Sequence, residues 1–170
     1  SITLSSSANA DINGILHLNA DYNTNAGSTV TTVTGTIDNH GTISGATTAK
    51  LIFSGGTYVH AQNAGTIPTA SWGAGSVLQL SGTTTTFPAN MGQNFRNIVI
   101  NAVFSAPVQI GTDVNCLGNL TINLSGAANS LQLTNSNTNR TVTVGGNFIL
   151  QAGTFSLDNN NGGSSFNLSG

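Results

Sequence analysis

Short runs of strictly alternating apolar and polar residues recur along the chain. Residues 120–124, 131–133, 142–144 and 166–168 each place a large apolar side chain at every second position. A period of two is typical of strands that bury one face. No apolar pattern with helical spacing persists over three turns, and clusters of glycine and asparagine, such as residues 135–139, separate the runs. The sequence therefore predicts an all-β chain.

A weak internal repeat favours one all-β architecture. Three segments in which asparagine precedes a large apolar residue superpose on Phe95, Leu120 and Phe148, at intervals of about 25 and about 28 residues. The unit between the last two contains three short strands and two polar turns, which is the plan of one coil of a parallel β-helix. We therefore predict a right-handed parallel β-helix, or β-solenoid, with coils of about 25–28 residues, forming a single domain over residues 1–170. Phe95, Leu120 and Phe148 should stack in one inward column. A β-sandwich is the alternative, because strand spacing alone does not exclude it.

Charged side chains are scarce, with three Lys and Arg, five Asp and Glu, and a net charge of −2. No basic patch is available to neutralise phosphates, so we expect no nucleic-acid partner. The longest apolar runs are too short to cross a bilayer, so we expect no membrane insertion. The single cysteine, Cys116, permits neither an internal disulfide nor a cysteine-based zinc site, and we expect it to be buried and inert. The abundant asparagine and threonine should form turns and polar ladders between coils.

One segment concentrates side chains that could bind a ligand. Residues 66–76 and 82–92 are predicted to be longer excursions from the coil, where a solenoid places its function. Residues 58–72 contain Tyr58, His60, Gln62, Asn63 and Trp72. On a strand Tyr58, His60 and Gln62 share a face, and an aromatic ring beside amides suits a sugar. These five residues form a candidate glycan-binding set. The alternative is that Tyr58 and Trp72 pin the segment against the solenoid wall.

Groups for catalysis or metal binding are few and scattered. Asp11 and Asp38 are the only carboxylates spaced one predicted coil apart, whereas a glycosidase needs converging carboxylates and a calcium-dependent lyase needs a cluster of them. His17 and His40 could stack in adjacent coils, but a third metal ligand would have to come from a distant residue. We therefore expect no enzyme activity, no metal and no cofactor.

Three stretches carry a family resemblance: GGTYVHAQNAGTIPTASW at residues 55–72, residues 95–101, and RTVTVGGNF at residues 140–148. They resemble the repetitive segments of large secreted surface proteins of Bacteroidetes, which are substrates of type IX secretion. The resemblance implies an extracellular or cell-surface β-solenoid. It implies no activity.

Four functions follow, in order of preference. The first is a structural or adhesive segment, such as a stalk, adhesin or filament unit. The second is a glycan-binding module that uses residues 58–72. The third is a polysaccharide lyase or hydrolase, and the fourth is ice binding, suggested by threonines at residues 83–86 and 141–143. Residues 1–4 and 164–170 are uncharged and carry no capping signal, which predicts end-to-end self-association or continuation by neighbouring solenoid segments.

Overall fold

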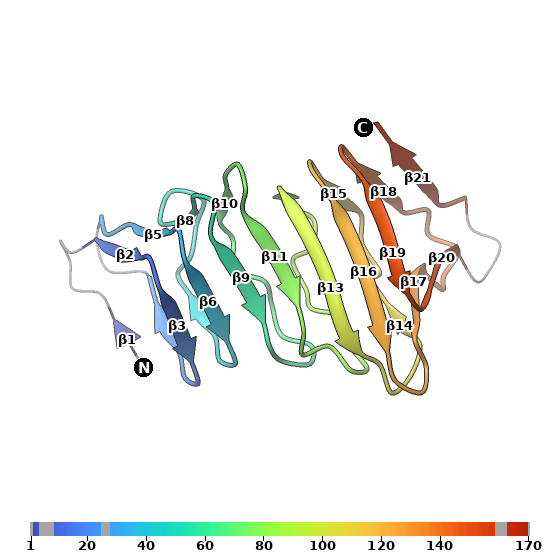
Figure 1. Cartoon of the computed structure of the whole chain (residues 1–170), viewed down its shortest axis with the longest axis horizontal. Coiled ribbons are helices and arrows are strands. Elements are labelled where there is room, and N and C mark those ends of the chain that lie inside the picture. The colour runs from blue at the N-terminus through green and yellow to red at the C-terminus, as the bar shows by residue number, and fades with distance from the viewer. Residues whose placement is uncertain (1, 4–8, 25–27, 159–162, 170) are drawn as a thin grey trace.

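The computed structural model of this protein is a right-handed solenoid of parallel β-strands (Figure 1). It describes residues 2–3, 9–24, 28–158 and 163–169. Within these ranges every paired strand runs parallel to its neighbour, and no helix is present that could cross a membrane. The predicted all-β parallel β-helix is confirmed. The β-sandwich alternative is wrong, because it would require antiparallel hairpins.

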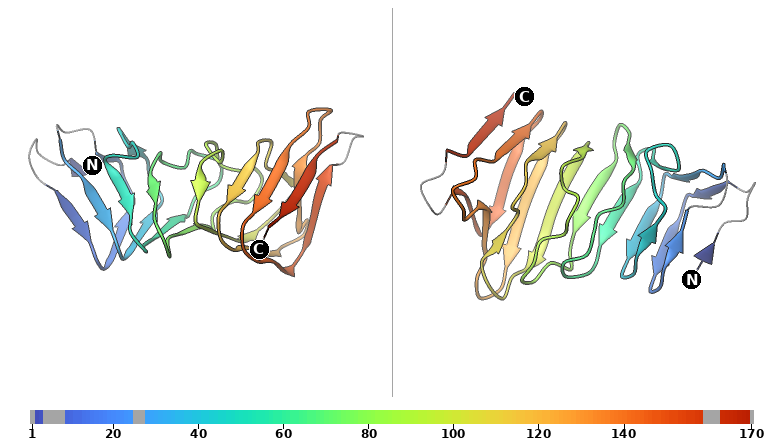
Figure 2. Two further views of the ribbon diagram at one scale, coloured as in Figure 1. Left: turned by 90° about the horizontal axis from the view of Figure 1, so that it is seen from above. Right: turned by 180° about the vertical axis from the view of Figure 1, so that it is seen from behind.

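Each turn of the solenoid passes over up to three faces, which we number in chain order. Face three is one sheet of seven strands, whereas faces one and two are each divided into an N-terminal and a C-terminal sheet. Face one contains β1 (Ile2–Thr3), β4 (Tyr22–Asn23), β7 (Ile43–Ser44), β14 (Val108–Gln109), β17 (Ser130–Thr134) and β20 (Thr154–Asp158). Face two contains β2 (Ala10–Ile12), β5 (Thr31–Val33), β8 (Leu51–Phe53), β10 (Ser71–Trp72), β12 (Asn94–Phe95), β15 (Val114–Cys116), β18 (Thr141–Val144) and β21 (Ser165–Leu168). Face three contains β3 (Ile15–Leu18), β6 (Thr36–Asn39), β9 (Thr57–His60), β11 (Val77–Leu80), β13 (Asn97–Val103), β16 (Leu120–Ser125) and β19 (Phe148–Ala152). The N-terminal and C-terminal strands lie at opposite ends of the rod (Figure 2).

Strand register shows how long each coil is. The inward column of face three consists of Leu16, Ile37, Tyr58, Leu78, Ile98, Leu120 and Phe148. Successive members are about 20–22 residues apart, except for the last two, whose interval is about 28 residues. The predicted coil length is therefore too long for all but the last of these intervals.

Phe95 does not belong to this column. It lies in β12 on face two and pairs with Cys116, whereas Leu120 and Phe148 pair with each other as predicted. The error arose because asparagine precedes an apolar residue twice within a few positions, at Asn94 and at Asn97. The Asn97 side chain accepts a hydrogen bond from the Asn119 amide at 3.1 Å, so the second of these pairs is the true structural repeat.

Residues 66–76 and 82–92 are part of the solenoid wall, and the prediction of two excursions is wrong. Ile67 and Trp72 point inward in the first segment, as Phe87 and Met91 do in the second. An isolated parallel bridge joins Thr66 to Ala89 on face one. Because the coils are shorter than predicted, both segments are needed to complete a turn.

Asparagine ladders connect neighbouring coils, as predicted. Asn115 Nδ2 donates to Asn94 Oδ1 at 2.7 Å on face two, and Asn123 Nδ2 donates to Asn101 Oδ1 at 3.0 Å on face three. Such ladders satisfy outward amides without using charge. Cys116 is fully buried, and this burial raises the pKa of its thiol, in agreement with the expected inert role.

Candidate functional site

Tyr58 and His60 share a face, as predicted, but that face is the interior. Neither side chain has exposed surface. Tyr58 lies between Ile37 and Leu78 in the inward column of face three, and Val59 occupies the outward position between Tyr58 and His60. A sugar cannot stack on a ring that is enclosed by its own core, so the predicted glycan surface is not formed by these two residues.

The two side chains instead form a buried chain of hydrogen bonds. Asn39 Nδ2 donates to the Tyr58 hydroxyl at 2.8 Å, and that hydroxyl lies 3.3 Å from His60 Nδ1. His60 Nε2 lies 2.6 Å from the Ala64 carbonyl oxygen, so it carries the proton, and Nδ1 accepts from Tyr58. Burial lowers the pKa of His60 and raises the pKa of Tyr58. Both groups are therefore held neutral, and every polar atom of the two rings is satisfied.

Gln62 and Asn63 hold the turns next to this chain. Gln62 Nε2 donates to the Gly41 carbonyl at 2.7 Å, in the preceding coil. Asn63 Oδ1 accepts from three consecutive backbone amides, those of residues 84–86, each at 3.0 Å. The threonine run that suggested ice binding is thus a turn in the following coil, organised by Asn63, and forms no regular row.

Trp72 belongs to an aromatic stack in the core. Its ring stacks on Phe53 with centroids 4.6 Å apart and an interplanar angle of 4°, and it meets Phe95 edge-on at 5.0 Å. Only 9% of its surface is exposed. Of the five predicted glycan residues, three therefore pack inside the rod and two tie its turns, and no exposed aromatic face remains among them.

The polar cluster of greatest chemical interest lies on the outer surface of face three, at the N-terminal end. His17 Nδ1 is 2.8 Å from Asp38 Oδ2, and His40 Nε2 is 3.4 Å from Asp38 Oδ1. Register explains the contact, because His17 pairs with Asp38 across β3 and β6. In the part of the chain that the structure describes, no three His, Cys, Asp or Glu side chains are placed to hold a metal ion.

The Ser81 hydroxyl is out of reach of this cluster. Ser81 lines the same shallow groove, but Ala61 lies between the positions of His40 and Ser81 on the adjacent strands. Two strand spacings amount to about 9.6 Å, far beyond hydrogen-bond distance. The imidazoles therefore cannot activate the Ser81 hydroxyl in this arrangement.

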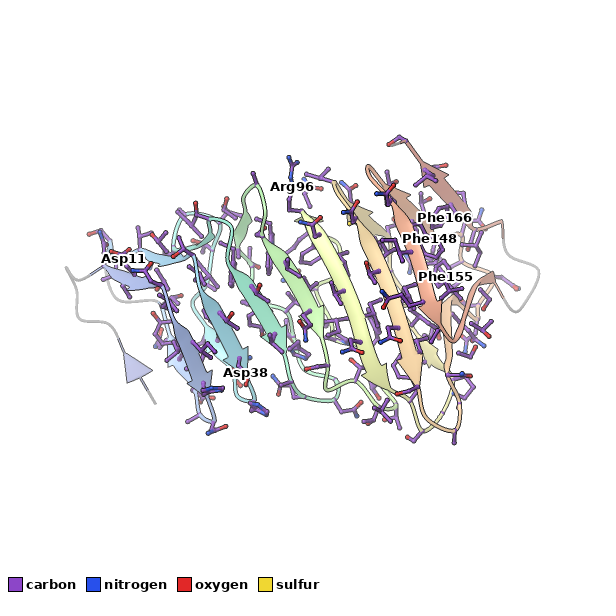
Figure 3. The ribbon with its side chains drawn as sticks, in the orientation of Figure 1. Asp11, Asp38, Arg96, Phe148, Phe155 and Phe166 are labelled. Carbon is purple, nitrogen blue, oxygen red and sulfur yellow. The ribbon has the colours of Figure 1, made fainter. Side chains whose placement is uncertain are left out.

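Asp11 and Asp38 do not converge. Asp11 pairs with Thr32 on face two, while Asp38 lies on face three (Figure 3). The register of β3 and β6 shows a coil shorter than predicted, so stacking does not bring these two carboxylates together. The pairing of carboxylates that a glycosidase requires is not provided by these residues.

A groove opens on face two, at the division between its N-terminal and C-terminal sheets. Its volume is about 430 Å³, and its lining includes Thr69, Ser71, Trp72, Gln93 and Asn94. Only Trp72 was singled out in the sequence. The signal that could have revealed the groove is the unequal length of two corners: Leu78 follows Trp72 by six positions, but Ile98 follows Phe95 by only three.

The C-terminal end of the rod carries a second aromatic group. Phe148, Phe155 and Phe166 gather there with centroids 4.9–6.3 Å apart (Figure 3). Nearby Leu150 and Leu168 are 44% and 57% exposed. An apolar surface is therefore open to solvent at this end of the rod.

Comparison with protein-family models, with curated proteins and with solved structures finds no match to this chain.

Proposed function

We propose that this chain is a structural segment of an extracellular surface protein, acting as a rigid stalk or adhesive spacer without catalysis. One observation carries the proposal: the seven strands of face three pair without a break along the rod. Six strand spacings give the sheet a length of about 29 Å. The resemblance of residues 55–72 to secreted surface proteins supports the extracellular location.

The interior supports a rigid spacer. Each inward column joins the coils by apolar contact, and fully burying one such side chain contributes about 1.5–3 kcal/mol. Inside the rod, Asn39, Tyr58 and His60 bond to one another instead of lining a channel. A solenoid of this kind positions whatever is attached to its ends.

The experiment is a distance measurement between paired spin labels. His17 and Thr121 belong to one outward row of face three, five strand spacings apart, and Ile149 is the next member. In a Cys116→Ala background, labels at His17→Cys and Thr121→Cys should give one narrow distribution centred at about 24 Å. Labels at His17→Cys and Ile149→Cys should give a distance about 4.8 Å longer than the His17 and Thr121 pair. Broad or multiple distances for the His17 and Thr121 pair would contradict a rigid spacer.

We also propose that the C-terminal end of the rod associates with a neighbouring solenoid. The exposed Leu150 and Leu168 beside the phenylalanine group, and the open edges of β19, β20 and β21, support this. Sedimentation across a concentration series should show association of the wild-type chain, which the Leu150→Lys, Leu168→Lys double variant loses. A wild-type chain that stays monomeric at every concentration would rule out self-association through this end of the rod.

A further inference from the structure

The groove lies where the sheet of face two is divided between β10 and β12. The hydrophobic core beneath it is continuous. β10 pairs only with β8, and β12 pairs only with β15, among the strands that the structure describes. Beneath this division the rings of Trp72 and Phe95 touch at 5.0 Å, which is close to one strand spacing. The two coils are therefore adjacent inside the rod and separate only toward the solvent.

The unequal corners explain why the coils separate there. The corner after β10 is three residues longer than the corner after β12, although β11 and β13 pair in register on face three. The backbones of β10 and β12 therefore cannot also align on face two. Gln93 bridges the inner part of the gap: its Oε1 accepts from the Ala70 amide at 3.1 Å and from Trp72 Nε1 at 3.2 Å.

The outer part of the groove retains unused hydrogen-bonding groups. The Ser71 hydroxyl and Asn94 Nδ2 have no hydrogen bond to any described residue, although Asn94 Oδ1 accepts from Asn115. Successive residues of a parallel strand direct their backbone groups to opposite neighbours. Because the Gly73 amide donates to Phe53 on the β8 side, the amide and carbonyl of Trp72 point toward the groove.

The residues that line the groove indicate which kind of ligand it could bind. No charged residue lines the groove among those described, so neither a phosphate nor a carboxylate would find a counter-charge there. Hydroxyl and amide side chains line the groove together with Trp72 and with Leu117, which is 45% exposed. A volume of about 430 Å³ lies within the range of small-molecule sites. Donors and acceptors beside an apolar surface together match a polyhydroxylated ring.

We propose that this groove binds a neutral oligosaccharide, with Ser71, Asn94 and the backbone of Trp72 as hydrogen-bonding groups. The inference goes beyond the structural role, since a stalk needs no such site. A peptide strand is the less suitable occupant. An inserted strand would direct every second side chain inward, where the Trp72 and Phe95 rings are in contact with centroids 5.0 Å apart.

Trp72 reports on the site because it is the only tryptophan of the chain. The wild-type protein is titrated with neutral tetrasaccharides of glucose, xylose, mannose and N-acetylglucosamine, with tetragalacturonate and tetraalanine as charged and peptide probes. We expect at least one neutral saccharide to change the Trp72 emission saturably, with a Kd of about 0.1–10 mM, and calorimetry to give the same value.

Matched variants locate the binding. Ser71→Ala with Asn94→Ala removes one hydroxyl and one ladder amide at the groove and should weaken binding about tenfold. Thr121→Ala with Asn101→Ala makes the same two changes on face three and should leave binding unchanged. The proposal is overturned if no neutral saccharide binds the wild-type chain in calorimetry. It is equally overturned if the two double variants weaken binding alike, or if only tetragalacturonate or tetraalanine binds.

Discussion

Replacing Tyr58 with phenylalanine tests whether the buried hydrogen-bond chain stabilises the rod. The change removes only the hydroxyl and leaves the ring between Ile37 and Leu78. His60 Nδ1 then loses its only hydrogen-bond partner among the described residues, whereas Asn39 Nδ2 keeps its bond to the Gly41 carbonyl at 3.0 Å. One buried acceptor is left unsatisfied, and one donor loses a second partner.

The expected cost follows from these two losses. An unsatisfied buried acceptor costs about 1–3 kcal/mol, and a lost hydrogen bond with a remaining partner costs less. Tyr58→Phe should therefore lower the free energy of unfolding by about 2 kcal/mol. In a chain of this length that loss corresponds to a decrease in Tm of about 4–8 °C.

The other tyrosine of the chain supplies the control. The Tyr22 hydroxyl is also buried, but it has a single partner, the Thr31 hydroxyl at 2.7 Å. Tyr22→Phe likewise leaves one buried group, the Thr31 hydroxyl, without its partner among the described residues, so it should cost a similar amount, about 1–3 kcal/mol. Urea unfolding is followed by circular dichroism and by the emission of Trp72, which lies 6.4 Å from the Tyr58 ring. If Tyr58→Phe costs much less than Tyr22→Phe, or if it stabilises the chain, the hydroxyl does not organise this network.

Three further predictions concern His60, two glycines and Cys116. Burial lowers the pKa of His60 below its ordinary value of 6.5, so the folded chain prefers the neutral ring; stability should be full above pH 6.5 and fall as the pH drops below it. Urea midpoints across this range should show the fall, and His60→Gln should reduce it. A Cβ on Gly35 would clash with the Gly14 carbonyl oxygen, while one on Gly14 would meet nothing within 4 Å. Gly35→Ala should therefore cost about 1–3 kcal/mol, and Gly14→Ala should be neutral or stabilising in the same melts. Burial raises the pKa of Cys116, so a thiol reagent at pH 8 should label it only after unfolding; rapid labelling of the native chain would contradict its burial.

The fold was predictable because it depends on local patterns. Alternation along each strand, turns rich in glycine and asparagine, and the absence of helical spacing all indicate stacked parallel strands. Register was not predictable from the asparagine motif, since Asn94 and Asn97 offer two alignments that differ by three residues. The pairing of Ile98 with Leu120 and the contact between the Asn97 side chain and the Asn119 amide distinguish them in the structure.

The candidate site depended on register and was therefore harder to predict. Alternation places Tyr58 and His60 on one face but does not say which face is buried. Val59 has the more apolar side chain, so the pattern alone favoured the opposite orientation. With the shorter coil that the register shows, however, Tyr58 aligns with Ile37 and Leu78, and this apolar column would have indicated the interior.

The unequal lengths of two neighbouring corners create the groove on face two. A solenoid with equal corners would continue both its outer sheet and its core past β10, and its outer surface would be a closed ladder of hydrogen bonds. Here the corner between Trp72 and Leu78 is longer than the corner between Phe95 and Ile98, while the face-three strands that follow them stay in register. The difference in corner length therefore separates the strands β10 and β12 on face two. The core beneath them stays closed, because Trp72 and Phe95 remain in contact. Exposed backbone and side-chain polar groups are the result. Local departures from a repeating pattern are where functional sites are expected. Deleting three of the four residues of this corner, residues 73–76, should therefore close the groove and abolish saccharide binding, while the rod stays intact by circular dichroism.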